Sequence, residues 1–263
     1  YDMKFTNGYW LTRPEYRMDY ASHCVRGEAE NSELKLLVAC RPVHNRGEAI
    51  GCPALTVRLS APRENIIRVF VTHFEGEVDR LPRLETFGEN TEPAIEFGGD
   101  CALFTSGALT ARACMAEGGW KLDFLDESGN VITSSGFRAM AHEVKEEGET
   151  ASIQKTGPSY MIDSLDLAVG ETVYGLGERF TAYVKNGQTV DIWNAGGGTA
   201  SERAYKNVPF YMTNRGYGVF VEDPTEVSFE VASEKVERVQ FSVPGERLTY
   251  DVIYGGTPKG TLD

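Results

Sequence analysis

Short segments in which apolar and polar residues alternate run through most of this chain, and they constrain its fold more than any other feature. Leu55, Val57 and Leu59 alternate with polar neighbours, a period of two residues that places one set of side chains on each face of a strand. Comparable β-rich segments are Ile66 to Phe74, Leu109 to Cys114, Trp120 to Leu125, Tyr217 to Val221, Val227 to Val231, Val236 to Val243 and Leu248 to Tyr254. Many short strands separated by turns predict an all-β fold, an antiparallel β-sandwich with one or two short helices.

The connections between these segments carry further signals. Asp126 to Asn130 has the composition of a tight turn and predicts a hairpin. Ala200 to Lys206, after three consecutive glycines, is the segment with short-helix character. Ala141 to Ser152 is rich in glutamate and has little to bury, so we expect it to form an exposed excursion.

Charge and cysteine content exclude several classes of protein. The formal net charge is −13 and no cluster of Lys and Arg occurs, which argues against nucleic-acid binding. The acidity suits a solvated surface and is compatible with an uncharged substrate such as a sugar. The five cysteines form no CxxC pair, so we expect reduced, mostly buried thiols and neither a disulfide framework nor a metal site. No segment reaches the about 20 apolar residues of a membrane span, and the N-terminus has no apolar leader, which predicts a cytoplasmic protein with no membrane partner.

The richest motifs lie between Tyr174 and Tyr217, which we call the motif segment. Gly175 and Gly177 permit a backbone turn that side chains would block, and Glu178 and Arg179 follow, paired to each other or to neighbours. This is not a dinucleotide-binding fingerprint, because Arg179 and Phe180 replace the expected small residues.

Trp193 and Asn194 precede a run of glycines, which predicts a mobile loop beside an aromatic platform. An aromatic ring and an amide suit sugar recognition, and the alternative is a buried tryptophan beside a flexible turn. Further along, Phe210 and Tyr211 are expected to be core aromatics.

The sequence lacks the marks of a complete catalytic site. It contains no nucleophile elbow, no HExxH and no P-loop. The four histidines are far apart in the chain, and His73 is interpreted as a satisfied core residue. A glycosidase needs two carboxyl groups held about 5–10 Å apart, and no such pair is evident from sequence context. Glu178 alone lies in a distinctive motif, and Arg179 beside it would keep it ionised. We therefore expect no catalytic residue, no cofactor and no metal in this chain.

The motif segment resembles the N-terminal domain of glycoside hydrolase family 31, and most closely the bacterial α-xylosidase and α-glucosidase branch. The residues that carry the resemblance are Tyr174 to Phe180, Asn186 to Thr189, Trp193-Asn194 and Ala204 to Gly218, with weaker collinear matches before Leu165. The resemblance implies a galactose-mutarotase-like β-sandwich over residues 1–243. Residues 244–263 would supply a last strand and a linker toward a (β/α)8 barrel, absent from this chain, that carries both catalytic aspartates.

The resemblance also assigns roles to single residues. A loop over the mouth of the barrel maps onto Trp193, Asn194, Ala195, Gly196 and Gly197, which would contribute to substrate binding. Relatives often carry an acid at the position of Gly196, so recognition of the leaving group is expected to differ here. The residues that would maintain the motif's structure are Gly175, Gly177, Glu178, Arg179, Phe180, Asn207, Pro209 and Phe210. The implied partners are the chain's own C-terminal barrel and a carbohydrate, with a homo-oligomer left open.

Two alternatives remain at this stage. A free-standing carbohydrate-binding module would present Trp193 as an exposed platform. A sugar mutarotase would need a histidine acid and a glutamate base facing one concave sheet, and His73 and His142 have no recognisable context for that role.

Overall fold

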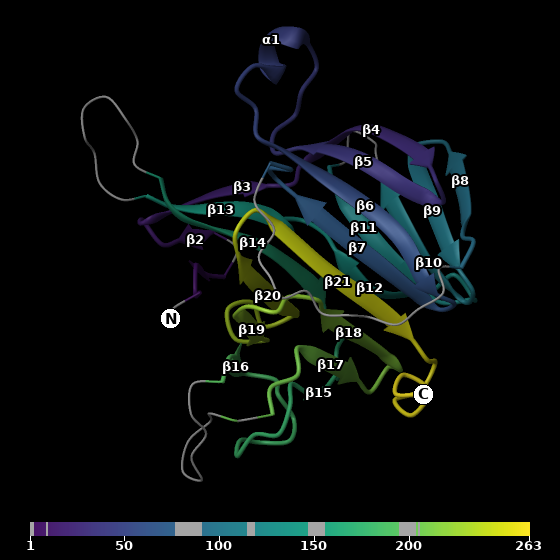
Figure 1. Ribbon diagram of the computed structural model, residues 1–263, viewed down its shortest axis with the longest axis vertical. Coiled ribbons are helices and arrows are strands. Elements are labelled where there is room, and N and C mark those ends of the chain that lie inside the picture. The colour runs from purple at the N-terminus through teal and green to yellow at the C-terminus, as the bar shows by residue number, and fades with distance from the viewer. Residues whose placement is uncertain are drawn as a thin grey trace.

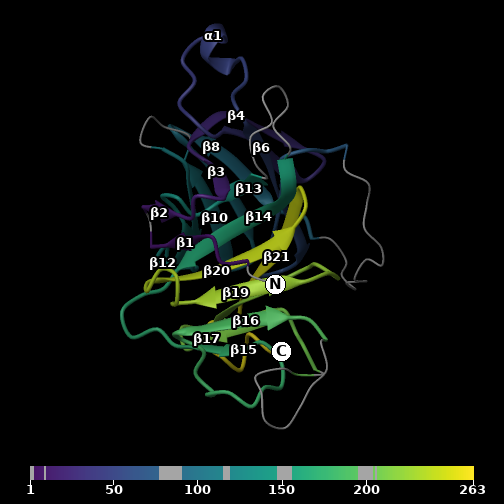
Figure 2. The same cartoon turned by 90° about the vertical axis from the view of Figure 1, so that its left-hand side faces the viewer.

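The structure is a computed structural model that describes residues 3–8, 10–76, 91–114, 119–146, 156–194, 204 and 206–263. Within these residues the protein consists of antiparallel strands and one single-turn helix, α1 (Arg46–Ala49), as Figures 1 and 2 show. Asn45 caps α1 by accepting hydrogen bonds from the backbone N–H groups of Gly47 and Glu48. The predicted all-β fold is confirmed, and among the described residues none forms a helix long and apolar enough to cross a membrane.

Three large sheets and a two-stranded ribbon make up the fold. The eight-stranded sheet has the order β15 (Val173–Gly175), β17 (Phe210–Thr213), β18 (Tyr217–Val221), β21 (Arg247–Tyr254), β7 (Ile66–Thr72), β6 (Ala54–Arg63), β5 (Glu33–Ala39) and β4 (His23–Glu30). The six-stranded sheet has the order β16 (Gln188–Ile192), β19 (Val227–Val231), β20 (Arg238–Pro244), β14 (Thr156–Asp166), β13 (Ala141–Glu146) and β3 (Tyr16–Tyr20). The five-stranded sheet has the order β12 (Val131–Ser135), β11 (Lys121–Leu125), β10 (Leu109–Cys114), β9 (Cys101–Ser106) and β8 (Ala94–Gly98), and β1 (Thr6–Asn7) pairs with β2 (Leu11–Thr12).

One hydrophobic core joins the sheets. Strand β6 has the predicted alternation, with Leu55, Val57 and Leu59 fully buried between half-exposed neighbours. The aromatic rings of Phe241 in β20 and Tyr250 in β21 meet edge to face, with centroids 4.9 Å apart, and so connect the six-stranded and eight-stranded sheets. Each such fully buried side chain contributes about 1.5–3 kcal/mol by removing apolar surface from water.

The outer face of the six-stranded sheet is covered as well. The backbone N–H groups of Phe5 and Thr6 donate to Glu234 Oε1 at 2.8 and 3.0 Å, which fastens the N-terminal segment over the sheet. Gln240 in β20 donates to the other carboxylate oxygen of Glu234 at 2.7 Å. Because both faces of this sheet are covered, its polar side chains are buried and need internal partners.

Three expectations need correction. Ala141 to Glu146 is not an exposed excursion, because it forms β13 between β3 and β14 and its first four residues are buried; the remainder, 147–152, lies outside the described residues. The cysteines are free thiols, but only Cys24 is buried and the other four are half-buried. The helix expected at 200–206 falls almost entirely on residues outside the described set, and α1 was not foreseen.

Other expectations have clear outcomes. The hairpin at Asp126 is confirmed, because Asp126 Oδ1 accepts from the N–H groups of Ser128 and Asn130 at 2.9 and 2.8 Å between β11 and β12. Strand β21 lies between β18 and β7 in the interior of its sheet (Figure 1). The residues after it fold into a turn in which Gly255 N–H donates to Gly216 O at 3.0 Å. The division of the chain at residue 243 stays a prediction.

Candidate functional site

The glycines of the motif segment bring two backbone stretches into direct contact. Gly175 and Gly177 have φ angles of +107° and +84°, a region that favours glycine. A Cβ on Gly175 would lie 2.7 Å from the carbonyl oxygen of Phe210, and one on Gly177 would lie 2.0 Å from that of Lys206. The turn after β15 therefore packs on the chain that leads into β17, and side chains at these two positions would separate them.

Arg179 connects three parts of the motif segment. Its Nε donates to Leu176 O at 2.9 Å, and its terminal nitrogen donates to Asp191 O at 2.8 Å and to the side-chain oxygen of Asn207. Glu178 is directed elsewhere and forms an exposed ion pair with Lys206, with Nζ and Oε1 3.0 Å apart. The guanidinium thus bonds to the backbone of the turn and to the strand that leads into the predicted loop. Glu178 is paired with Lys206 and not with Arg179.

Asn207 extends this network toward the predicted sugar-binding loop. Its amide nitrogen donates to Asn194 Oδ1 at 2.6 Å and to Ala204 O at 2.8 Å. Trp193 is 51% exposed, so the alternative of a buried tryptophan is wrong. The structure therefore brings Trp193 and Asn194 together with the Arg179 network, whereas Ala195, Gly196 and Gly197 lie outside the described residues.

Apolar side chains are exposed around this network. Phe180 follows Arg179 in the chain and is 71% exposed, and Val208 follows Asn207 and is 45% exposed. Pro209 and Phe210 follow Val208 in the chain, where Pro209 O accepts from Val221 N–H at 2.8 Å and Phe210 packs against Gly218. We call Phe180, Trp193 and Val208 the exposed apolar patch.

The chemistry available at the patch is that of binding. It combines aromatic surface, amide groups and an exposed Glu178–Lys206 pair. The carboxylate of Asp191 already has a hydrogen-bond partner, because its Oδ1 accepts from Ser228 Oγ at 2.7 Å. Among the described residues of the motif segment, the carboxylates of Glu178 and Asp191 thus each have a partner of their own, Lys206 and Ser228.

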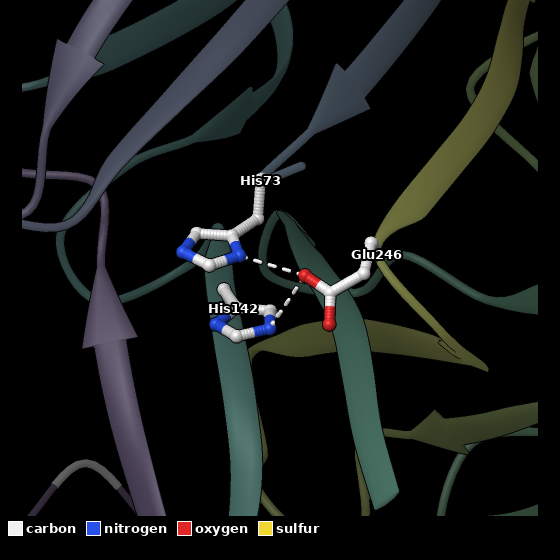
Figure 3. Close-up of side chains that lie close together, drawn as sticks. All are labelled: His73, His142 and Glu246. Carbon is white, nitrogen blue, oxygen red and sulfur yellow. Dashed lines mark hydrogen bonds and ion pairs between the residues drawn. The ribbon is translucent and has the colours of Figure 1, made fainter. Parts of the chain in front are cut away.

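Two histidines that are distant in the sequence come together elsewhere in the fold. The rings of His73 and His142 stack with centroids 3.7 Å apart and an interplanar angle of 8°. Glu246 faces both, with its Oε2 2.7 Å from His73 Nδ1 and 3.0 Å from His142 Nε2 (Figure 3). His73 is satisfied by Glu246, as expected, but its side chain is half-buried and so lies outside the core. No local sequence signal indicates this cluster.

The electrostatics of Glu246 reflect its neighbours. Burial opposes ionisation, but the close contacts with the His142 and His73 rings and the hydrogen bond from Ser159 outweigh it and hold the pKa of this carboxyl well below its ordinary value. A general base works best with a pKa near the working pH. Glu246 is thus a stable carboxylate and a weak base.

Comparison with known proteins gives a consistent result. The family model for the glycosyl hydrolase 31 N-terminal galactose mutarotase-like domain matches residues 56–230. The α-xylosidase XylQ of Lactiplantibacillus pentosus is 39% identical, over 99% of this chain and 33% of its own length. An α-xylosidase of Emericella nidulans is also 39% identical, over 99% of this chain and 34% of its own length. The chain therefore spans about a third of the length of these curated relatives.

Solved structures show the same fold. The cycloalternan-forming enzyme of Listeria monocytogenes, solved with a pentasaccharide substrate, superposes with a TM-score of 0.71. The superposition covers 91% of this chain and 21% of that enzyme, at 16% sequence identity. At this identity the match shows a shared fold.

Proposed function

Because this chain belongs to the glycosyl hydrolase 31 N-terminal galactose mutarotase-like domain family, we propose that it is the non-catalytic N-terminal domain of a longer retaining α-glycosidase. The expected substrates of the whole enzyme are α-xylosides or α-glucosides. The observation that carries the proposal is the coverage: the chain aligns over 99% of its length with α-xylosidases, yet with only about a third of theirs.

The exposed apolar patch gives the domain a surface for the rest of such an enzyme. Phe180, Trp193 and Val208 each adjoin, along the chain, a residue of the Arg179 hydrogen-bond network. Grouped exposed apolar side chains mark a surface that another part of a protein covers. Its proposed occupant is the catalytic barrel of the same polypeptide, with Trp193 and Asn194 at the margin of the sugar site.

The first experiment compares this chain with the longer polypeptide encoded by its gene. We expect the longer protein to hydrolyse 4-nitrophenyl α-xyloside or α-glucoside, and this chain alone to show no turnover, because its motif segment offers binding groups only. The measurement is release of 4-nitrophenolate under identical conditions. Clear hydrolysis by the 263-residue chain alone would contradict the proposal.

A second experiment tests the contribution of Trp193 to the sugar site. In the longer protein, Trp193→Ala should raise KM for a disaccharide about tenfold, equivalent to about 1.4 kcal/mol of lost contact. Trp10→Ala is the matched control, because Trp10 is also exposed but lies under the Arg138 guanidinium and away from the motif segment. Equal effects of the two substitutions would argue against a role of Trp193 in binding.

Neither alternative function is favoured. A mutarotase needs an effective glutamate base, and the contacts of Glu246 with His142, His73 and Ser159 make it a weak one. Polarimetry on fresh α-glucose should therefore show no catalysis by this chain. A free-standing module should bind xylose or glucose oligomers by itself, and the proposal expects no binding at millimolar sugar.

The proposal includes a cytoplasmic location, supported by five free cysteines, which persist in reducing compartments. Recovery of the longer protein from the secreted fraction would contradict it. Homo-oligomerisation of the longer protein is a further part of the proposal, suggested by the family resemblance, and light scattering would test it.

A further inference from the structure

Three side chains from distant parts of the chain converge at one end of the sandwich. His73 follows β7, His142 lies in β13, and Glu246 lies in the turn between β20 and β21. Figure 3 shows one nitrogen of each imidazole ring beside the same carboxylate oxygen of Glu246. One donor atom from each residue, two imidazole nitrogens and one carboxylate oxygen, lies within 4.8 Å of the other two.

The environment of His142 requires an explanation. Its side chain is 3% exposed, its Nδ1 has no hydrogen-bond partner among the described residues, and its Nε2 has only the ion-pair contact with Glu246. The 3.0 Å approach of its Nε2 to Glu246 Oε2 is close, but it lacks the direction of a hydrogen bond. A buried polar group without a partner costs about 1–3 kcal/mol, so proteins rarely keep one without a use.

From this arrangement we propose that His73, His142 and Glu246 form a binding site for a divalent transition-metal ion, with Zn²⁺ as the favoured ion. Two imidazoles and a carboxylate are a donor set that zinc uses in sites where a water molecule completes the coordination. The sequence-based expectation of no metal rested on the cysteine spacing, the lack of an HExxH motif and the separation of the histidines along the chain, whereas the fold brings two of these histidines together.

The spacing of the donors is close to what zinc needs. With ligand distances of about 2.0–2.1 Å, the donor atoms of a tetrahedral site lie about 3.3 Å apart. The carboxylate oxygen of Glu246 is 2.7 and 3.0 Å from the two imidazole nitrogens, so the ion would push these groups apart by a few tenths of an ångström.

Binding also requires one ring to turn. The lone pair of an imidazole nitrogen lies in the ring plane, and two stacked parallel rings cannot both direct their lone pairs at one ion. His73 is the ring able to turn, because it follows the end of β7 and 30% of its side chain is exposed, whereas His142 is enclosed within β13. The exposed sides of His73 and Glu246 also give an ion and its water access from solvent.

The carboxylate is held in position from behind. Ser159 Oγ donates to Glu246 Oε1 at 2.5 Å, leaving Oε2 directed at the two rings. Such outer hydrogen bonds orient metal-binding carboxylates, and their loss typically weakens metal affinity about 10–100-fold. Ser159→Ala should therefore weaken zinc binding within that range without removing a ligand.

The test is titration of the chelator-treated 263-residue chain with ZnCl2 in an isothermal calorimeter. We expect one ion per chain with a micromolar or tighter dissociation constant. His142→Gln and Glu246→Gln, which preserve side-chain size, should each weaken binding by more than about 100-fold, since each removes a ligand. His44→Gln is the control, because His44 is an exposed histidine outside the cluster, and it should bind as the unmodified chain does.

A second measurement does not depend on the variants folding. Titration of the unmodified chain with CoCl2 should produce the intense visible absorption of four-coordinate Co²⁺, and ZnCl2 should abolish it. Imidazole NMR signals of two histidines should shift in the same titration. The absence of one-to-one binding, or retention of full affinity in both His142→Gln and Glu246→Gln, would overturn the proposal.

Discussion

The motif segment and strand β13 differ in how far their polar side chains are hydrogen-bonded. In the motif segment, the guanidinium of Arg179 donates to two backbone carbonyls and to Asn207, which in turn donates to Asn194. In β13, Nδ1 of His142 and both carboxyl oxygens of Glu143 have no hydrogen-bond partner among the described residues, and both side chains are buried. One region has paired its polar groups, and the other keeps them unpaired at a cost in free energy.

This difference has consequences for mutation. In a paired network almost any change removes a favourable contact, so substitutions in the motif segment should destabilise the fold. Where a buried polar group lacks a partner, replacing it can remove a penalty, so a suitable substitution in β13 should stabilise the fold. The two regions therefore predict effects of opposite sign.

The largest effect is expected for Gly177→Ala in the motif segment. Its Cβ would lie 2.0 Å from the carbonyl oxygen of Lys206, and its φ of +84° is strained for alanine. Strain and displacement of the facing backbone together should lower the free energy of unfolding by about 3–4 kcal/mol. Denaturant unfolding followed by circular dichroism measures this loss.

Gly187→Ala is the matched control for that substitution. Gly187 has the same φ of +84°, but a Cβ there would meet no atom within 4 Å. This substitution should lower the free energy of unfolding only by the cost of alanine at positive φ, about 1–2 kcal/mol. If both glycines gave the same loss, the close backbone contact at Gly177 would not contribute to stability.

These glycines also show why the motif segment could be interpreted from sequence. A turn that needs positive φ and close backbone approach depends on residues next to one another, so Gly175 and Gly177 indicate it locally. The exposure of Trp193 could be expected in the same way, although its link through Asn194 to Asn207 could not.

The burial of strand β13 could not be predicted, because it depends on residues that are far away in the sequence. Its glutamates suggested an exposed excursion, yet β3 and β14 pair with it on either side, and Ala141 is buried in one cluster with Met3 and Phe5. The cluster of His73, His142 and Glu246 depends on three separate elements, and no spacing within the sequence indicates it. Non-local packing determined both features, and periodicity reports only local preference.

The second prediction concerns the protonation of Glu143 in β13. Burial, and to a lesser degree the nearby Glu234, raise the pKa of Glu143 to about 9 from its ordinary value of 4.5. The folded state therefore keeps a proton between these two pH values that the unfolded chain has lost. The free energy of unfolding is therefore not reduced by this group below pH 4.5, and it declines as the pH rises toward about 9.

Glu143→Gln removes that titration and should stabilise the protein at neutral pH. The gain should be about 2–3 kcal/mol at pH 7, should grow toward pH 9 and should vanish near pH 4. Unfolding free energies measured across this range test the sign. Glu30→Gln, at the exposed end of β4, is the control and should change stability by less than about 0.5 kcal/mol. A destabilised Glu143→Gln would show that the carboxyl has a partner after all.

The smallest effect on stability is expected for Arg179→Lys, which changes the hydrogen-bonding geometry of the side chain and keeps its charge. Arg179→Lys keeps the positive charge but cannot reach Leu176 O, Asp191 O and Asn207 together, since lysine lacks the planar fork of the guanidinium. We expect a loss of about 1–2 kcal/mol, the value of one or two hydrogen bonds. Lys206→Ala removes only an exposed ion pair with Glu178 and should cost less than about 0.5 kcal/mol. If Arg179→Lys were as mild as Lys206→Ala, charge alone would account for Arg179, and the contrast with β13 would rest on the glycine turn.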